Sequence, residues 1–212
     1  IKNKNILKLF KKPLIAHVIK IAHESKLFSK IIVSTDSPKI AKIANKYGAL
    51  TPFLRKKKLS GSKITIKETL VDCINIINSK KIAYHFCLYA TAIFLQPDDL
   101  KKAFKKIKKF NGNVLLPVVR NLNSLRSFKL INKNQIRFYN EKYSTTMSQD
   151  LPELYSDSGT FFIFKTEPYL KIKSFFPKKI IPFYIEKYKS IDLNDDQDLK
   201  LLKLISKGLN KE

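Results

Sequence analysis

The chain has 212 residues, of which 44% are hydrophobic and 28% are charged, a composition typical of a globular protein with a buried core. Its 42 Lys and Arg against 17 Asp and Glu give a formal net charge of +25, but most of the excess is lysine spread along every segment, so we expect no specific nucleic-acid partner. No apolar run approaches the roughly 20 residues that cross a bilayer, so we expect no membrane span.

Helix and strand patterns alternate along the chain. Apolar residues at helical spacing predict helices over residues 13–28, 38–47, 65–78, 97–110, 166–172 and 195–207. Short β-branched or aromatic runs predict strands over residues 30–35, 84–90, 114–119, 159–165 and 180–186. Residues 127–131 and 135–139 flank Asn132-Lys133-Asn134, which predicts a small β-hairpin excursion. This order indicates one α/β domain over residues 1–212, with a mostly parallel sheet flanked by helices.

The loops that follow the predicted strands are the expected ligand-binding region, because α/β sheets bind ligands outside the carboxyl ends of their strands. One such region is the polar segment 148–158, which passes through a proline turn into Asp157-Ser158-Gly159 and then into an apolar strand. Gly159 is expected to adopt a positive φ or to let backbone approach a ligand closely. The segment therefore predicts a set of hydrogen-bonding groups beside a buried strand.

A second polar region lies at residues 190–198, just past the last predicted strand. Asp192 and Asn194 are two residues apart, so both side chains leave the same face of an extended segment. Oxygen ligands placed in this way suit Mg²⁺, which takes one or two protein carboxylates and completes its shell with water and phosphate oxygens. Spacing alone favours a simple helix start over a metal site, because Asp195 and Asp196 in a first turn suit the helix dipole.

Other candidate residues are weaker when taken singly. Lys4-Asn5 could place an ammonium and an amide beside a phosphate and a base, and Arg55 could pair with a phosphate. Three scattered histidines without a ligand-spaced partner give no support to zinc catalysis or to Ser-His-Asp hydrolysis. Cys73 and Cys87 are expected to be buried reduced thiols, as in a cytoplasmic protein.

Together these segments resemble the acylneuraminate cytidylyltransferases, the CMP-sugar synthetases. The matching stretches occur in the family's order and are residues 4–6, 12–16, 31–37, 51–55, 88–92, 148–159, 192–194 and 198. The Tyr89-Ala-Thr-Ala92 form and the Asp157-x-Gly159-x-Phe161 form resemble the pseudaminate branch of the family more than the sialate branch.

The resemblance implies a Rossmann-like nucleotidyltransferase fold, a cytoplasmic homodimer and a Mg²⁺ cofactor. The implied reaction joins CTP to a nonulosonic acid, pseudaminic acid by preference, and gives the CMP-sugar and pyrophosphate for surface-glycan or flagellin glycosylation. The implied roles are a catalytic and phosphate-binding Lys4, nucleotide contacts from Asn5 and Arg55, sugar contacts from Gln149, Tyr155 and Asp157, and metal ligands Asp192 and Asn194.

Departures from the family pattern leave alternatives open. The family's opening strand and its Ala-Arg-x-Gly-Ser-Lys phosphate loop are absent from these residues, and Asn194 stands where a second metal carboxylate is usual. We therefore expect an N-terminally truncated domain with little or no activity as a 212-residue piece. One alternative keeps the enzyme class but takes legionaminate, N-acetylneuraminate or a deoxy-octulosonate. Another is a degenerate, non-catalytic relative that acts as a binding or partner protein.

Overall fold

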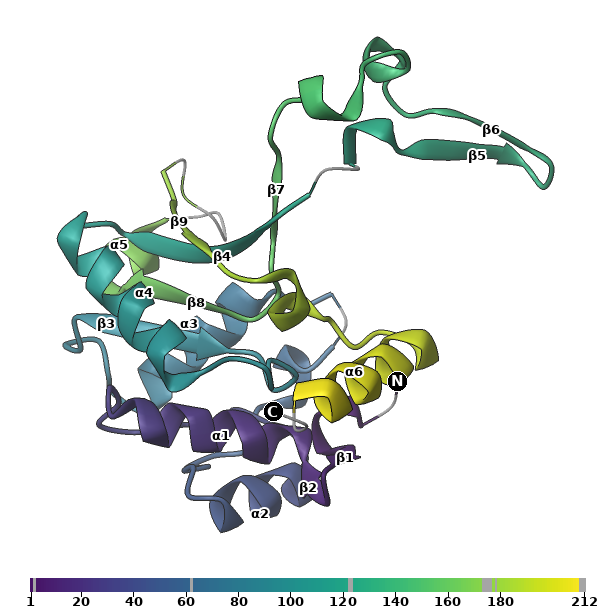
Figure 1. Cartoon of the computed structure of the whole chain (residues 1–212). Coiled ribbons are helices and arrows are strands. Elements are labelled where there is room, and N and C mark those ends of the chain that lie inside the picture. Colours follow the sequence, from purple (N-terminus) through teal and green to yellow (C-terminus); the bar gives the residue numbers. More distant parts are fainter. Residues whose placement is uncertain (2, 62, 122–123, 173–176, 178, 210–212) are drawn as a thin grey trace.

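The computed structural model describes residues 1, 3–61, 63–121, 124–172, 177 and 179–209. The α-helices in this part of the chain are α1 (Leu14–Ser25), α2 (Pro38–Lys46), α3 (Ile66–Ile76), α4 (Pro97–Lys109), α5 (Thr166–Lys171) and α6 (Asp196–Leu209). The strands are β1 (Lys8–Leu9), β2 (Lys12–Pro13), β3 (Tyr84–Leu88), β4 (Val114–Arg120), β5 (Phe128–Asn132), β6 (Gln135–Phe138), β7 (Tyr155–Asp157), β8 (Phe161–Lys165) and β9 (Ile181–Tyr184). Figure 1 shows a body of helices around a central sheet, with β5 and β6 standing away from it.

The central sheet has the strand order β3-β8-β4-β7, and β9 also pairs with β4. Strand β8 lies between β3 and β4 and is antiparallel to both, whereas β9 runs parallel to β4. Strands β3, β4 and β9 therefore share one direction, and β7 and β8 run against them. The carboxyl ends of the first three strands and the amino end of β8 consequently meet at one edge of the sheet.

Strand β8 is the centre of the hydrophobic core. Its residues Phe161 to Phe164 are each at most 1% exposed. Because side chains alternate across a strand, Phe161 and Ile163 pack with α4 residues such as Leu100, while Phe162 and Phe164 pack on the other face. The second face is covered by α3 and α5, through residues that include Tyr169. Helices thus cover the sheet on both faces.

The predicted helices form because their ends carry good capping residues. The Ser37 hydroxyl accepts the Ile40 N–H at 3.4 Å, and Pro38 occupies the first helical position. Thr65 and Glu68 form a reciprocal capping box at the start of α3. Gly48, with φ +92°, ends the turn after α2. Caps of this kind satisfy backbone groups that a helix leaves without partners.

Two expectations about strands need correction. The α/β class is confirmed, but the sheet in the described residues is mostly antiparallel, since only the β4–β9 pair is parallel. The reason is the excursion that follows β4. The chain returns from it at the end of the sheet where β4 finished, so β7 and β8 run in the opposite direction to β4. The predicted strand over 30–35 is reduced to a single parallel bridge between Ile32 and Leu50, because no other described strand pairs with it.

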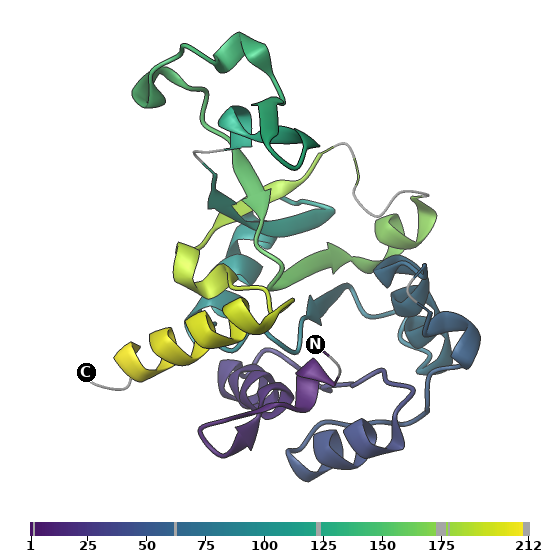
Figure 2. The same cartoon turned by 90° about the vertical axis from the view of Figure 1, so that its right-hand side faces the viewer.

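The predicted hairpin is confirmed and forms the tip of a protruding arm, defined here as residues 121 and 124–154. Strands β5 and β6 pair antiparallel, with Phe128 opposite Phe138. Figure 2 shows the arm rising from β4 and β7, clear of the helices. Several of its apolar side chains are exposed: Phe128, Leu130, Ile131, Ile136, Tyr139 and Met147. The arm therefore presents apolar surface that the described part of the chain does not cover.

Both cysteines are free, as expected. Burial raises the pKa of Cys73 to about 11 and that of Cys87 to about 12, so both stay protonated near neutral pH.

His85 bridges Ser79 and Thr166 through its two ring nitrogens, at 3.0 and 2.7 Å. No helix in the described residues has both the length and the apolar character to cross a membrane.

The central position of β8 yields a stability prediction. Ile163→Ala removes a fully buried side chain from the core, so the free energy of unfolding should fall by about 2–5 kcal/mol, as measured by urea denaturation. Leu204→Ala is the matched control, because Leu204 is 67% exposed on α6. Equal stability of the two variants would contradict the assignment of β8 as the core strand.

Candidate active site

The edge of the sheet where β3, β4 and β9 end gathers several predicted site residues. Leu88, the last residue of β3, pairs with Phe161, the first residue of β8. The turn 157–159 that leads into β8 therefore lies next to Tyr89, whose N–H donates to the Thr160 carbonyl at 2.9 Å. Strand β9 leads through the 3₁₀ helix η6 (Lys187–Ser190) to residues 192–194, as the path in Figure 1 shows.

Asp157 is held by the turn it begins. Its Oδ1 accepts the Gly159 N–H at 2.9 Å, and Gly159 has φ +63°, which confirms the predicted positive φ. Burial raises the pKa of the Asp157 carboxyl, and the hydrogen bond from Gly159 lowers it only in part. Asp157 is thus a partly desolvated carboxylate at the sheet edge.

Lys4, Asp192 and Asn194 form one cluster. Lys4 lies in the 3₁₀ helix η1 (Lys4–Ile6), with the half-buried Asn5 next to it. The Lys4 Nζ lies 3.6 Å from the Asp192 Oδ1 and donates to the Leu193 carbonyl at 2.9 Å. The Asn194 Nδ2 donates to the Asp192 Oδ2 at 3.0 Å. Residues 188 positions apart in sequence therefore meet, as the resemblance implied.

The neighbouring carboxylates of Asp195 and Asp198 have a different role, at the start of α6. The Asp195 Oδ1 accepts the N–H groups of Gln197 and Asp198 at 2.8 and 2.9 Å. The Asp198 Oδ2 accepts the N–H groups of Asn194 and Asp195 at 2.8 and 3.1 Å. These two side chains start α6, whereas the half-exposed Asp192 stays outside the helix and faces Lys4.

Tyr89 stands in the Tyr89-Ala-Thr-Ala92 motif, but no role in the site was predicted for it from the sequence. Burial and then the charges of Cys87, Asp157, Tyr169 and Asp192 raise the pKa of its hydroxyl, so it stays protonated. Tyr89 therefore lies within electrostatic reach of both Asp157 and Asp192. The usable signal was its position as the first residue after β3.

Arg55 lies on a neighbouring segment of the same region. Its backbone N–H donates to the Thr35 carbonyl at 2.8 Å, its Nε donates to the Ser60 Oγ at 3.2 Å, and its Nη2 lies 3.7 Å from the Asp36 Oδ1. Three partly buried residues, Ile6, Val33 and Ala90, pack against one hydrophobic cluster. Because they flank Lys4, Thr35 and Tyr89 in sequence, this packing brings the Arg55 segment close to η1 and the end of β3.

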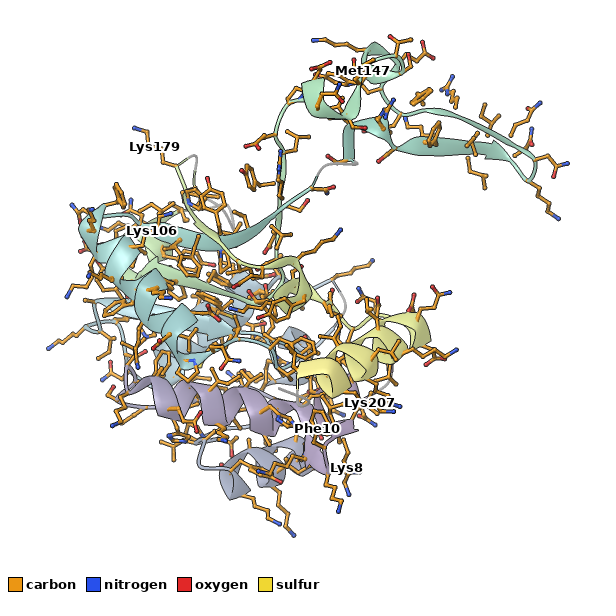
Figure 3. The ribbon with its side chains drawn as sticks, in the orientation of Figure 1. Lys8, Phe10, Lys106, Met147, Lys179 and Lys207 are labelled. Carbon is orange, nitrogen blue, oxygen red and sulfur yellow. The ribbon has the colours of Figure 1, made fainter. Side chains whose placement is uncertain are left out.

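Gln149 and Tyr155 are not brought to this cluster within one chain. Gln149 lies on the arm and contacts Met147 Sδ at 3.1 Å, and Figure 3 places Met147 high on the arm, far from Lys8 and Phe10 on the body. Tyr155 pairs with Arg120 at the base of the arm, and its hydroxyl donates to the Glu153 Oε2 at 3.0 Å. Its ring packs on Tyr184, with centroids 5.0 Å apart.

The donor atoms present fit a Mg²⁺ ion that keeps water and phosphate ligands. Among the described residues, no group of three or more His, Cys, Asp or Glu side chains forms a complete metal site. Asp192 offers one exposed carboxylate, and the amide of Asn194 lies against it at 3.0 Å and carries a second oxygen. One carboxylate suffices for Mg²⁺ when substrate phosphates supply further oxygens. These residues therefore do not fit a site in which the protein supplies every ligand of the metal ion.

A hollow of about 590 Å³ lies elsewhere on the surface. Its lining comes from the end of the 3₁₀ helix η2 (Lys57–Leu59), from α3 and from Ile172. None of the predicted site residues lines it. It is therefore a second place to look for a ligand, separate from the Lys4–Asp192 cluster.

Comparisons with known proteins find similar sequences. A family model described as Cytidylyltransferase matches residues 1–207. The chain is 32% identical to a pseudaminic acid cytidylyltransferase from Campylobacter jejuni subsp. jejuni serotype O:2, over 98% of this chain and 90% of that protein. It is 30% identical to a CMP-N,N'-diacetyllegionaminic acid synthase from the same organism, over 97% and 88% of the two chains.

A solved structure of a CMP:2-keto-3-deoxy-manno-octonic acid synthetase complexed with CTP has a similar fold. The TM-score is 0.60 at 12% identity, and the match covers 98% of this chain and 80% of the other. At this identity the likeness bears on the fold alone.

The raised pKa of Asp157 gives a pH prediction. A carboxyl whose pKa rises on folding binds its proton more tightly in the folded state, so stability falls as pH increases through that pKa. Asp157→Asn keeps an acceptor for Gly159 and removes the charge, so the variant should be more stable than wild type near neutral pH. The gain should shrink towards about pH 3, below the ordinary Asp pKa, where both states are largely protonated.

Urea denaturation at the two pH values measures this difference. Asp150→Asn, at an exposed position on the arm, is the control and should show no such pH dependence. A constant difference between Asp157→Asn and wild type at both pH values would contradict the desolvation of Asp157.

Proposed function

The chain belongs to the cytidylyltransferase family, and we propose that it activates a nonulosonic acid, pseudaminic acid by preference, with CTP. The products would be the CMP-sugar and pyrophosphate, formed in the cytoplasm. The CMP-sugar would then serve surface-glycan or flagellin glycosylation. The observation that carries this proposal is the cluster of Lys4, Asp192 and Asn194 at the edge of the sheet. A relative named as a pseudaminic acid cytidylyltransferase matches 98% of this chain.

The proposed reaction is a nucleotidyl transfer. The anomeric hydroxyl oxygen of the sugar acid forms a bond to the α-phosphorus of CTP, the bond from that phosphorus to the β-phosphate oxygen breaks, and the hydroxyl proton is released with pyrophosphate. Catalysis of such a step is mostly positioning and charge neutralisation. Mg²⁺, when bound, supplies Lewis-acid stabilisation of phosphate charge.

The chain's own residues would divide this work. Lys4 is the proposed phosphate-binding and catalytic cation, and Asp192 with Asn194 would hold the metal ion. Asn5 and Arg55 would contact the nucleotide. Asp157 would contact the sugar from the turn before β8.

We also propose a homodimer formed through the arm. Its exposed apolar side chains, among them Leu130 at 73% and Ile136 at 58% exposure, form the kind of surface that monomers rarely leave in water. A second copy seated there would cover them and would bring Gln149 and Tyr155, which stand apart from the cluster in one chain, against the partner.

One observation favours a second candidate function. Asn194 leaves a single carboxylate in the metal-binding pair, which is the feature expected of a non-catalytic relative that acts as a binding or partner protein. Calorimetry with CTP and Mg²⁺ separates the two, because such a relative need bind neither. The expectation that these 212 residues alone have little activity stays a prediction, which the assay below tests when it is run on these residues alone.

The main test is turnover by the protein. With CTP and Mg²⁺, CMP-sugar formation should be fastest with pseudaminate in a panel that also contains legionaminate, N-acetylneuraminate and a deoxy-octulosonate. Asp192→Asn should lower kcat/KM by about 100-fold, because it removes the carboxylate of the proposed metal pair. Asp196→Asn, in the exposed first turn of α6, should leave it nearly unchanged.

Loss of activity in both variants, or in neither, would argue against Asp192 as a metal ligand. A different preferred sugar would keep the enzyme class and replace pseudaminate. No product with any sugar, together with no binding of CTP, would favour the non-catalytic candidate.

The dimer is tested by light scattering coupled to size-exclusion chromatography. Leu130→Glu combined with Ile136→Glu places charge in the proposed interface and should halve the measured mass. Lys133→Glu combined with Lys129→Glu alters charge on the same hairpin without removing apolar surface, and it should leave a dimer. A wild-type mass equal to one chain would refute the dimer.

A further inference from the structure

Lys189 stands out in the segment that leads to Asp192. Its side chain is 6% exposed, and among the described residues it is the one charged residue in the buried class. It lies in η6, three residues before Asp192. A buried ammonium is costly unless it is paired and hydrogen-bonded, so its partners indicate what it does.

Its principal partner is Asp99 in the first turn of α4. The Lys189 Nζ lies 3.0 Å from both carboxylate oxygens of Asp99, whose side chain is only 13% exposed. The Asp99 Oδ2 also accepts the Gln96 N–H at 2.8 Å and so belongs to the cap of α4. The pair therefore joins η6 to the start of a core helix.

Glu186 is a second partner at the rim of this contact. Its Oε2 lies 2.9 Å from the Lys189 Nζ, but its side chain is 60% exposed. Burial lowers the pKa of Lys189, but the hydrogen bonds and charges of Glu186 and Asp99 outweigh it and the net pKa is raised. The lysine thus keeps its charge near neutral pH, and its buried contact is with Asp99.

The other side of the segment is anchored as well. Leu193 is fully buried in a cluster with Leu9, Leu14 and Leu202, and its carbonyl accepts the Lys4 Nζ. Only three residues, Ser190, Ile191 and Asp192, separate the two anchors. The place of the Asp192 carboxylate relative to Lys4 is consequently fixed from both ends.

We propose that Lys189 is a positioning residue for Asp192: its ion pair with Asp99 holds η6 against α4 and so sets the Asp192 carboxylate where the triphosphate and its metal ion bind. The anchoring follows from the contacts of this chain. The ligand at Asp192 rests on the proposed function.

Hydrogen exchange tests the anchoring without any substrate. In Lys189→Met, amides of residues 190–195 should exchange about 10-fold faster than in wild type, while those of β8 keep their protection. Lys189→Arg, which keeps the charge, should restore most of the protection. Lys187→Met is the matched control, because Lys187 is an exposed lysine on the same 3₁₀ helix.

Steady-state kinetics of the protein test the consequence. Lys189→Met should lower kcat/KM by up to about 100-fold, through misplacement of Asp192, and should raise the Mg²⁺ concentration needed for half-maximal rate. Lys189→Arg should recover most of the activity. Glu186→Gln should have a small effect, because Glu186 is largely exposed.

A double variant separates positioning from simple stability. Lys189→Met leaves Asp99 buried and unpaired, whereas Lys189→Met with Asp99→Asn removes both charges and should regain much of the thermal midpoint. The proposal expects the double variant to keep fast exchange at 190–195 and a low kcat/KM. Recovery of exchange protection and kinetics together with the midpoint would show a merely structural role and overturn the proposal.

The two hypotheses fail in different ways. If wild type forms no CMP-sugar but the exchange pattern is as expected, the proposed function is refuted and the anchoring stands. If wild type is active and the exchange at 190–195 is the same in wild type, Lys189→Met and the double variant, the anchoring is refuted.

Discussion

Strand β8 is buried on both faces and hydrogen-bonded on both edges, and its direction determines where everything else lies. Its side chains alternate between the α4 side and the α3–α5 side of the sheet, so neither face can turn to water without losing most of the core. Because β8 runs against β3 and β4, its amino end lies at their carboxyl ends. The turn with Asp157 and Gly159 must therefore reach the edge at which Tyr89 and, after β9, Asp192 also lie.

Side chains of both charge signs lie at that edge, although the chain as a whole is strongly basic. The chain has a formal charge of +25, yet the edge gathers two carboxylates, Asp157 and Asp192, near the half-buried Tyr89. Lys4 balances Asp192 directly. A surface rich in lysine around such an edge favours the approach of a polyanion such as a nucleoside triphosphate, while the carboxylates provide for its metal ion.

Much of the fold could be predicted because the relevant signals are local. Caps at Ser37 and Thr65 and the glycine at 48 set helix ends through backbone hydrogen bonds, and the structure has them. The prediction of a mostly parallel sheet was wrong because the chain is reversed by the arm. The return of the arm to the sheet leaves no local pattern in the sequence. The prediction of a strand over residues 30–35 was wrong because β-branched residues indicate burial, whereas a strand also needs a neighbouring strand with which to pair.

The site could be predicted in part for the same reason. Lys4, Asp192, Asn194 and Asp157 meet at one edge, but Gln149 is carried away by the arm. Tyr89 was missed because a tyrosine after a strand looks like a core residue, and Lys189 because one lysine among so many gives no signal. Both are recognisable only through their surroundings, a carboxylate pair in one case and a buried aspartate in the other.

The most direct measurement is a crystal structure of the protein with CTP and Mg²⁺. The account predicts nucleotide density at the sheet edge, with the triphosphate between Lys4 and Arg55 and a metal ion against the Asp192 carboxylate. Density in the hollow between η2 and α3 instead, with Lys4 and Asp192 still paired and untouched, would contradict it.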